Sequence, residues 1–317
     1  HEDCRRQRQM CIRDRIISYH SDIWSYILAN SSYTSDSLDE QTLMYMNRHL
    51  QDLDKFKEFL NDSYYFIFFV IEELENAKLP IELAFLPYIE SNYDPFSISS
   101  SGAVGMWQFM PRTGRTYDLE RSWWNEDRHD PFKSTSAAIK YLKYLYERFD
   151  QDLYLTLAAY NAGPSFLDRQ IKRNQRRGLN SDYWSLDLPI QTRNYVPKFI
   201  AIKELIINSD QYDIELPFIP YEPVVAKIEI PGQVEILTLS EYLNIKPELL
   251  YKLNAGYTKW ASAPSEKSVF YIPIEQYDYF QTSENPFSDS NQINWISHTV
   301  ETCLLYTSDA ADDSLRV

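Results

Sequence analysis

The chain has 317 residues, of which 44% are hydrophobic and 15% aromatic, and its formal net charge is −15 at pH 7. This length and composition predict a globular protein with one large core or two modest domains, and they exclude an intrinsically disordered chain. The negative charge argues against nucleic acid as a partner, because phosphates attract basic surfaces, and no apolar run is long enough to predict a transmembrane helix.

Cysteine and histidine are sparse. Cys4, Cys11 and Cys303 all lie near the ends, and the five histidines are scattered along the chain. This spacing gives no support to a zinc site or to a histidine-based nucleophile triad, so we expect no metal and no cofactor. Acid–base catalysis by carboxylates is the chemistry that remains.

The two ends differ in pattern from the rest of the chain. Residues 1–14, which contain RRQRQMCIRDR, and residues 303–317, which contain LLYTSDAADD, resemble peptides translated from sequencing-adapter DNA. We expect both to be non-native tails and leave them out of the fold prediction, as one leaves out a fusion scar. Genuine flexible tails are the alternative.

Residues 15–212 are predicted to form a nearly all-helical domain. The periodicity of the apolar residues predicts helices over 15–62, 64–78, 80–91, 134–149, 152–163 and 191–207. Pro80 stands where a helix tolerates proline, at its start. Ser134 is expected to be the N-cap of its helix, and Gly163 with Pro164 is expected to end another.

The composition changes after the helical part. Three prolines in ELPFIPYEPVV, residues 215–225, indicate a linker. AKIEI, TLSEYLN, KPELLYKLN and VFYIPI then follow in the order strand, helix, helix, strand. We therefore expect a small α+β module at 223–280, followed at 281–302 by a linker and the start of a further, truncated unit.

One carboxylate stands out. The apolar run LAFLPYI ends on Glu90, which leads into a loop rich in Ser, Gly, Asn and Asp. Burial disfavours the ionised form of a carboxyl and raises its pKa, and a carboxyl that stays protonated near neutral pH is what a general acid needs. From this local context alone, a solvent-exposed glutamate at a helix end is an equal alternative.

Four motifs occur in a fixed order. They are Glu90-Ser91, the loop GAVGMWQ at 102–108, the block AYNAG at 159–163, and Tyr195 within TRNYVPK. Together they resemble the signature of the lytic transglycosylases that carry the soluble-lytic-transglycosylase domain, and the D-type branch of that family in particular. The resemblance extends over residues 50–280.

The resemblance implies a fold and a reaction. It implies a mainly α fold, in which a lysozyme-like helical domain cleaves the β-1,4 bond between N-acetylmuramic acid and N-acetylglucosamine in peptidoglycan. Glu90 would protonate the leaving oxygen and then act as the base while the muramyl 6-hydroxyl attacks its own anomeric carbon. This route gives a 1,6-anhydro end without a second carboxylate. Asp94 and Glu82 are the candidates for such a carboxylate, and we expect both to be structural.

Five further positions carry over as substrate-binding residues. The resemblance assigns Ser99 to the muramyl substituents and Gln108 to a hydrogen bond with the sugar or the loop. Tyr160 and Asn161 would line the cleft, and Tyr195 would hold Glu90 by a hydrogen bond. Each has a plainer alternative: Ser99 as a hydroxyl that caps its own loop, Gln108 as a surface residue, and the others as packing residues.

Aromatic residues and the small module extend the resemblance. Trp107 departs from the commoner family motif and is expected to pack the loop, whereas Trp123 and Trp124 could stack on sugars or lie in the core. Residues 223–280 resemble a LysM-like module, which binds N-acetylglucosamine in family members; a structural role is equally open. HTVE, residues 298–301, resembles the opening of a true LysM repeat.

Two other functions stay open. A goose-lysozyme-like hydrolytic muramidase would need a second carboxylate at about 6.5–9.5 Å from Glu90. A non-catalytic cell-wall binding protein would be expected to have lost the acid or the loop. The family resemblance implies peptidoglycan glycan strands as the partner, a monomer in the periplasm, and leaves open an outer-membrane lipid anchor on an N-terminal segment outside this chain.

Overall fold

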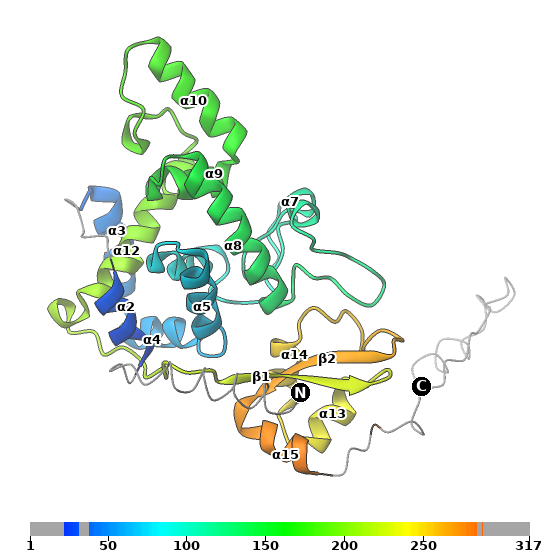
Figure 1. The fold of residues 1–317 in the computed structure, drawn as a ribbon. Coiled ribbons are helices and arrows are strands. Elements are labelled where there is room, and N and C mark those ends of the chain that lie inside the picture. Colours follow the sequence, from blue (N-terminus) through cyan, green and yellow to red (C-terminus); the bar gives the residue numbers. More distant parts are fainter. Residues whose placement is uncertain (1–21, 32–37, 284–286, 288–317) are drawn as a thin grey trace, which may run out of the picture.

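The computed structural model describes residues 22–31, 38–283 and 287. These residues are mostly helical and contain one two-stranded sheet (Figure 1). The two predicted tails, the three cysteines, HTVE and most of the predicted linker 281–302 lie outside the described residues.

The helical part runs to residue 212. In chain order its elements are α2 (Ile23–Asn30), α3 (Glu40–Leu50), α4 (Leu53–Asn61), α5 (Ile67–Ala77), η1 (Ile81–Phe85), α6 (Leu86–Glu90), α7 (Pro111–Thr116), α8 (Pro131–Arg148), α9 (Leu153–Ala162), α10 (Pro164–Arg176), η2 (Tyr183–Ser185), α11 (Ile190–Arg193), α12 (Tyr195–Ile207) and η3 (Ser209–Tyr212).

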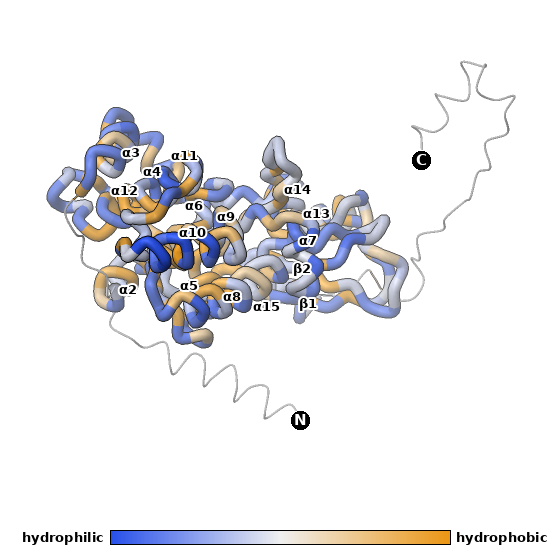
Figure 2. The backbone as a smooth tube through the Cα atoms, turned by 90° about the horizontal axis from the view of Figure 1, so that it is seen from above, coloured by the Kyte–Doolittle hydropathy of each residue, from blue (hydrophilic) through white to orange (hydrophobic). Residues whose placement is uncertain are grey.

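Helix α12 is the centre of the helical part. It is apolar on nearly every side, and a helix of that kind has to be enclosed by other elements. It contacts α3, α9 and the short α6, while α5 and α8 pack against each other beside it. Helix α10 has the opposite character: it is largely hydrophilic (Figure 2), buries little, and extends away from the other helices (Figure 1).

The predicted start of the helix at 134–149 is wrong. Ser134 is buried inside α8, which begins three residues earlier at Pro131. The N-cap is Asp130, whose Oδ1 accepts the backbone N–H groups of Phe132 and Lys133, each at 2.9 Å. An Asp followed by a proline at the first helical position is the stronger start signal.

The other differences also come from local chemistry. The predicted segment 15–62 forms three helices where the structure describes it, because Asp39 and Asp52 each cap a new helix start. Pro164 was predicted to help end a helix, and it also begins α10, since proline is tolerated at the first position. Helices α7 and α10 were not predicted.

The small module has the predicted order of elements. Strand β1 (Val225–Pro231) pairs antiparallel with β2 (Lys267–Pro273), with Val225 opposite Pro273. Helices α13 (Ile236–Tyr242) and α14 (Pro247–Leu253) lie between the strands in sequence, and η4 (Ile274–Gln276) and α15 (Tyr277–Thr282) follow them. The module has a hydrophobic cluster of its own, formed by Ile228, Ile230, Val234, Ile236, Leu239, Leu243, Ile245, Leu250, Phe270 and Ile272.

The module docks on the segment that leads into α8. The backbone carbonyl of Gly256 accepts the N–H of Glu126 at 2.8 Å, and the N–H of Thr258 donates to the carbonyl of Trp124 at 2.8 Å. The ring of Tyr271 stacks on Phe132, with 3.7 Å between the ring centroids. Residues far apart in sequence therefore hold the module against the helical part.

The same segment supports the loop 102–109. The guanidinium of Arg128 is buried, pairs with Glu126 at 2.9 and 3.0 Å, and donates to the backbone carbonyls of Gly102 and Phe109 at 3.3 and 3.1 Å. Gly105 lies so close that an added Cβ would stand 1.9 Å from the carbonyl oxygen of Arg128. The loop shape therefore depends on glycine at this position.

We expect Gly105→Ala to destabilise the protein far more than Gly102→Ala. Both glycines have a left-handed φ, +82° and +84°, so both substitutions carry a backbone cost of about 1–2 kcal/mol. Only at Gly105 does the new methyl group meet backbone, whereas Gly102 has open space around it. Urea unfolding of the two variants measures the difference, and equal costs would show that the contact with Arg128 does not constrain the loop.

Candidate active site

Glu90 is the last residue of α6, and its carboxyl is half-buried. The hydroxyl of Tyr195, at the start of α12, donates a hydrogen bond to Glu90 Oε1. Burial raises the pKa of Glu90 to about 7, although the Tyr195 hydrogen bond and the charge of Lys198 both lower it. Desolvation thus outweighs the two effects that favour the carboxylate, so the group is largely protonated below neutral pH.

Two buried tyrosines fix the short helix that carries Glu90. The hydroxyl of Tyr88 donates to Ser63 Oγ at 2.7 Å and lies 2.9 Å from the carbonyl of Leu60, while the hydroxyl of Tyr93 donates to the carbonyl of Ala84 at 2.6 Å. Both rings are in the core. The helix cannot shift without breaking these bonds, so the position of Glu90 is fixed by residues on either side of it.

The chain turns sharply directly after Glu90. Asn92 and Tyr93 both adopt a left-handed backbone, with φ of 59° and 57°, although neither is glycine. Ser91 Oγ donates to the backbone carbonyl of Met106 at 2.8 Å, which ties this turn to the loop 102–109. Ser91 thus has a structural contact that the sequence motif alone did not reveal.

Gln108 and Ser99 close the loops on which they lie. Gln108 has φ of 49°, and its Nε2 donates to the backbone carbonyls of Gly105 at 2.9 Å and Ser97 at 3.3 Å. Ser99 Oγ accepts the backbone N–H of Ala103 at 2.9 Å, the self-capping contact that was its plainer alternative. Contacts of either side chain with a sugar stay predictions.

Trp107, Tyr160 and Asn161 connect the loop to the helices. Trp107 is fully buried, and its indole N–H donates to Thr135 Oγ1 on α8 at 2.9 Å, so it packs the loop. The hydroxyl of Tyr160 donates to the backbone carbonyl of Trp107 at 2.7 Å, and Asn161 Oδ1 accepts the hydroxyl of Thr192 at 2.9 Å.

Tyr160 and Tyr195 share the environment of Glu90. The pKa of each phenol is raised well above its usual range, by burial first and by the charge of Glu90 second. The structure thus brings two of the predicted residues, Tyr160 and Tyr195, together around the carboxyl of Glu90. Ser99 and Gln108 lie on the adjoining loops, and Asn161 follows Tyr160 at the end of α9.

The two tryptophans at 123 and 124 differ in exposure. The side chain of Trp123 is 73% exposed, and the ammonium of Lys259 lies 3.8 Å from its ring centroid, whereas Trp124 is half-buried. Neither belongs to the core. Arg128, which donates hydrogen bonds to the loop at Gly102 and Phe109, was not predicted, because no motif in the sequence marks it.

The other two carboxylates considered above lie in contrasting surroundings. Glu82 is fully buried and accepts the hydroxyl of Ser31 at 2.6 Å, so it cannot activate a water molecule on a substrate. Asp94 is exposed, and its Oδ1 accepts the backbone N–H of Phe96 at 2.9 Å. Asp94 is therefore the carboxylate that a test of hydrolysis has to address.

Within the described ranges, no helix combines the length and the apolar character that a membrane span requires. The same residues contain no group of three or more histidine, cysteine, aspartate or glutamate side chains placed to hold a metal ion.

We expect Glu90→Gln to stabilise the protein increasingly as the pH rises. The pKa of Glu90 is about 7 in the folded protein and 4.5 in an exposed state. As the pH rises from 4.5 through 7, the unfolded chain ionises before the folded protein does, so the free energy of unfolding falls. Glutamine does not ionise. Between about pH 5.5 and 8.5, the advantage of the variant should grow by about 2 kcal/mol.

Urea unfolding at the two pH values measures this advantage, with Asp94→Asn as the matched control. Asp94 is exposed and its asparagine keeps the oxygen that accepts the Phe96 N–H, so this variant removes a neighbouring carboxylate without removing its hydrogen bond. An equal advantage of Glu90→Gln at both pH values would show that Glu90 is not desolvated.

The chain is similar to a known protein family and to several known proteins. Residues 69–182 match the family model of the transglycosylase SLT domain. Over 274 residues the chain is 30% identical to the membrane-bound lytic murein transglycosylase D of Escherichia coli, an alignment that covers 84% of this chain and 59% of that protein. Over 108 residues it is 33% identical to the membrane-bound lytic murein transglycosylase F of Alcanivorax borkumensis, covering 32% of this chain and 22% of that protein.

Among solved structures, the 70 kDa soluble lytic transglycosylase of Escherichia coli matches with a TM-score of 0.37 and 20% identity, over 58% of this chain and 32% of that one. The chain thus spans 59% of the length of the D-type relative. The residues that match the family model, 69–182, include Glu90, the loop 102–109 and the AYNAG block.

Proposed function

We propose that this protein is a peptidoglycan lytic transglycosylase, with Glu90 as its general acid and then its base. The observation that carries the proposal is a half-buried carboxyl with a pKa of about 7, held by Tyr195 beside a supported glycine-rich loop. The SLT domain and the relatives named lytic murein transglycosylases support peptidoglycan as the substrate. The bond cleaved is the β-1,4 bond between N-acetylmuramic acid and N-acetylglucosamine.

The proposed reaction has two proton transfers. Protonated Glu90 gives its proton to the glycosidic oxygen, and the N-acetylglucosamine side of the strand leaves with that oxygen as a hydroxyl. The 6-hydroxyl of the muramyl residue then attacks its own anomeric carbon and gives its proton to the Glu90 carboxylate. The product is a 1,6-anhydro end, Glu90 is protonated again, and no water is consumed. A group placed in this way contributes roughly 10²–10⁴ in rate.

The pKa of about 7 suits both transfers. A general acid works best when its pKa lies near the working pH, since the same group must then give up and take back a proton. The hydroxyl of Tyr195 stabilises the transient carboxylate, and desolvation favours its return to the protonated form. The site thus needs no second carboxylate.

The remaining residues position the substrate. Gln108 uses its amide N–H groups on loop carbonyls, which leaves its side-chain oxygen for a sugar. Ser99 lies just before this loop, where its hydroxyl accepts the N–H of Ala103, and Tyr160 and Asn161 lie at the end of α9, where Tyr160 donates to the carbonyl of Trp107. We assign all four to substrate binding.

We also propose the domain organisation that the sequence predicts. Residues 15–212 are a lysozyme-like domain, 223–280 a LysM-like module, and 281–302 a linker with the start of a LysM repeat, between non-native tails at 1–14 and 303–317. The relatives named as membrane-bound support a location in the cell envelope. We propose that the protein acts in the periplasm as a monomer.

Mass spectrometry of the muropeptides released from purified peptidoglycan tests the function. We expect anhydro-ended products from the full chain, and a loss of roughly 10²-fold or more in their rate of formation with Glu90→Gln. Asp94→Asn is the matched control, because it removes the exposed carboxylate four residues away, and it should retain activity.

Two results would overturn this function. Reducing-end products that require both Glu90 and Asp94 would indicate a hydrolytic muramidase, which uses a second carboxylate. Binding to peptidoglycan without release of any product would indicate a non-catalytic cell-wall protein.

Tyr195→Phe tests how Glu90 is tuned. The hydrogen bond from Tyr195 lowers the pKa of Glu90, so its removal should raise that pKa above about 7. The protonated acid then persists to higher pH, and the alkaline limb of the pH profile of kcat/KM should move upward by up to about one pH unit. Tyr160→Phe serves as the control, because the hydroxyl of Tyr160 donates to the carbonyl of Trp107 and should leave the limb near its original place. A downward shift in Tyr195→Phe would contradict the role.

A further inference from the structure

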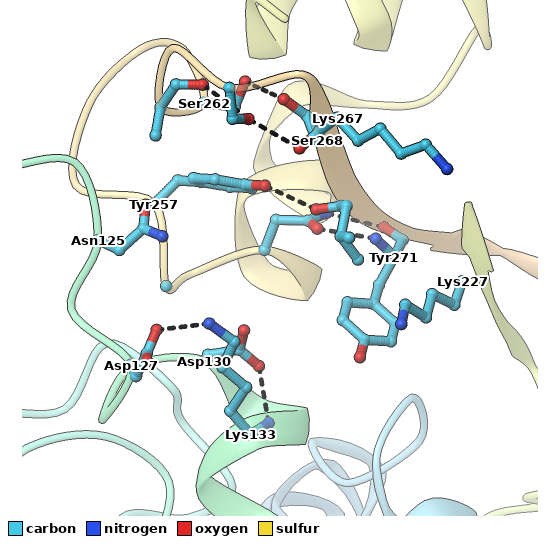
Figure 3. Close-up of a pocket in the computed structure, with 15 residues that line it drawn as sticks. Asn125, Asp127, Asp130, Lys133, Lys227, Tyr257, Ser262, Lys267, Ser268 and Tyr271 are labelled. Carbon is cyan, nitrogen blue, oxygen red and sulfur yellow. Dashed lines mark hydrogen bonds and ion pairs between the residues drawn. The ribbon is translucent and has the colours of Figure 1, made fainter. Parts of the chain in front are cut away.

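A cavity of about 440 Å³ lies where the small module meets the helical part (Figure 3). We propose that it is a second glycan-binding site, which holds a saccharide unit of the strand apart from the unit at Glu90. None of the residues proposed above to act on or bind the substrate lines it. The proposal rests on the proposed function for the identity of the strand, but the cavity and its chemistry stand on their own contacts.

Both parts of the protein form the walls. Asn125 and Asp130 lie on the segment that leads into α8, whereas Tyr257, Tyr271 and Lys227 belong to the module (Figure 3). The Tyr271–Phe132 stack and the bond between Gly256 and Glu126 hold these walls together. The cavity is therefore already formed, at a junction between two units, where ligand sites commonly occur.

Much of the polar lining is already paired. Lys133 forms an ion pair with Asp127 at 2.8 Å, and Lys267 forms one with Glu229 at 3.3 Å. These pairs neutralise two of the three lysines that line the cavity and one of its two aspartates. The cavity therefore does not present the concentrated positive charge that a polyanion would require.

Other groups remain available to a ligand. Among the described residues, no hydrogen bond or ion pair is found for the ammonium of Lys227 or the hydroxyl of Tyr271. Lys227 and Tyr271 face each other across β1 and β2, and their side chains lie side by side in the cavity (Figure 3). The cavity thus offers a charged donor and a hydroxyl next to each other.

A saccharide fits these groups better than a peptide stem. A sugar hydroxyl both donates and accepts, so it can pair with the hydroxyl of Tyr271 and accept from the ammonium of Lys227. The ring of Tyr257 adds an aromatic surface for the C–H groups of a pyranose. The volume lies within the usual range for sites of small ligands. A peptide with several carboxylates would find only Lys227 without an ion-pair partner among the three lysines of the lining.

A glycan held here would lie on the support of the active-site loop. The segment that contributes Asn125 and Asp130 also carries Arg128, which bonds the loop at Gly102 and Phe109. The site therefore gives a long strand a second attachment on the same rigid element. It should lower KM for long strands more than for short ones.

Binding of an N-acetylglucosamine tetramer to the full chain, followed by backbone amide NMR, tests the site directly. We expect the tetramer to shift the signals of residues 125–133 and 254–271. The double variant Lys227→Ala/Tyr271→Phe should weaken binding at these signals about tenfold or more, because it removes two hydrogen bonds while keeping the aromatic ring.

Lys246→Ala is the matched control. Lys246 is an exposed lysine of the same module and does not line the cavity, so its removal should leave the shifts unchanged. Signals around Glu90 that shift equally in all variants would show that the variants are folded and that the two sites are separate.

Two outcomes would overturn the proposal. One is a set of shifts confined to the surroundings of Glu90. The other is a cavity that responds to a free stem tripeptide, L-alanyl-D-glutamyl-diaminopimelate, and not to the tetramer. Because binding is measured without turnover, cavity shifts in a protein that releases no anhydro products would refute the proposed reaction and leave the glycan site standing.

Discussion

The arrangement of the site depends on keeping one carboxyl partly out of water at the end of a helix. Burial alone would drive Glu90 fully to its neutral form, and solvent alone would leave it ionised. The pKa of about 7 is a balance: desolvation raises the pKa, whereas the hydrogen bond from Tyr195 and the charge of Lys198 lower it. Tyr195 can do this only because it opens α12, the most enclosed helix, whose packing fixes where its phenol lies. The central core thus sets the chemistry of the acid.

A continuous set of contacts leads from the small module to that acid. Gly256 bonds the segment before α8, and Arg128 on this segment bonds the loop at Gly102 and Phe109. Met106 on the loop then accepts the hydroxyl of Ser91, the neighbour of Glu90. The module thus contributes to the position of the loop, because it packs on the segment whose Arg128 donates hydrogen bonds to the loop. The same docking also forms the cavity between the module and the segment before α8.

The sequence was sufficient where the signals are local. Apolar periodicity predicted the main helices and the strand–helix–helix–strand order of the module, because both follow from short-range patterns. It placed the start of α8 wrongly, since Ser134 and Asp130 are both acceptable caps and only the Asp130–Pro131 pair decides between them. Glu90 was marked by its own context, but Tyr195 could not be chosen among 25 tyrosines without the family motif. Arg128 and the cavity arise from residues distant in sequence, so no local pattern indicates them.

Among the described residues, nine non-glycine residues have a left-handed backbone, and three of them lie at the site. Asn92, Tyr93 and Gln108 adopt left-handed backbone conformations without being glycine, and all three lie within the turn and loop around Glu90. Ionisation of Glu90 in the folded protein adds a further cost above neutral pH. Such costs persist only where surrounding packing overrides them, and here the buried faces of Tyr88, Tyr93 and Trp107 provide it. The aromatic core beside Glu90 therefore keeps its pKa raised, because a looser core would let the carboxyl reach water and ionise.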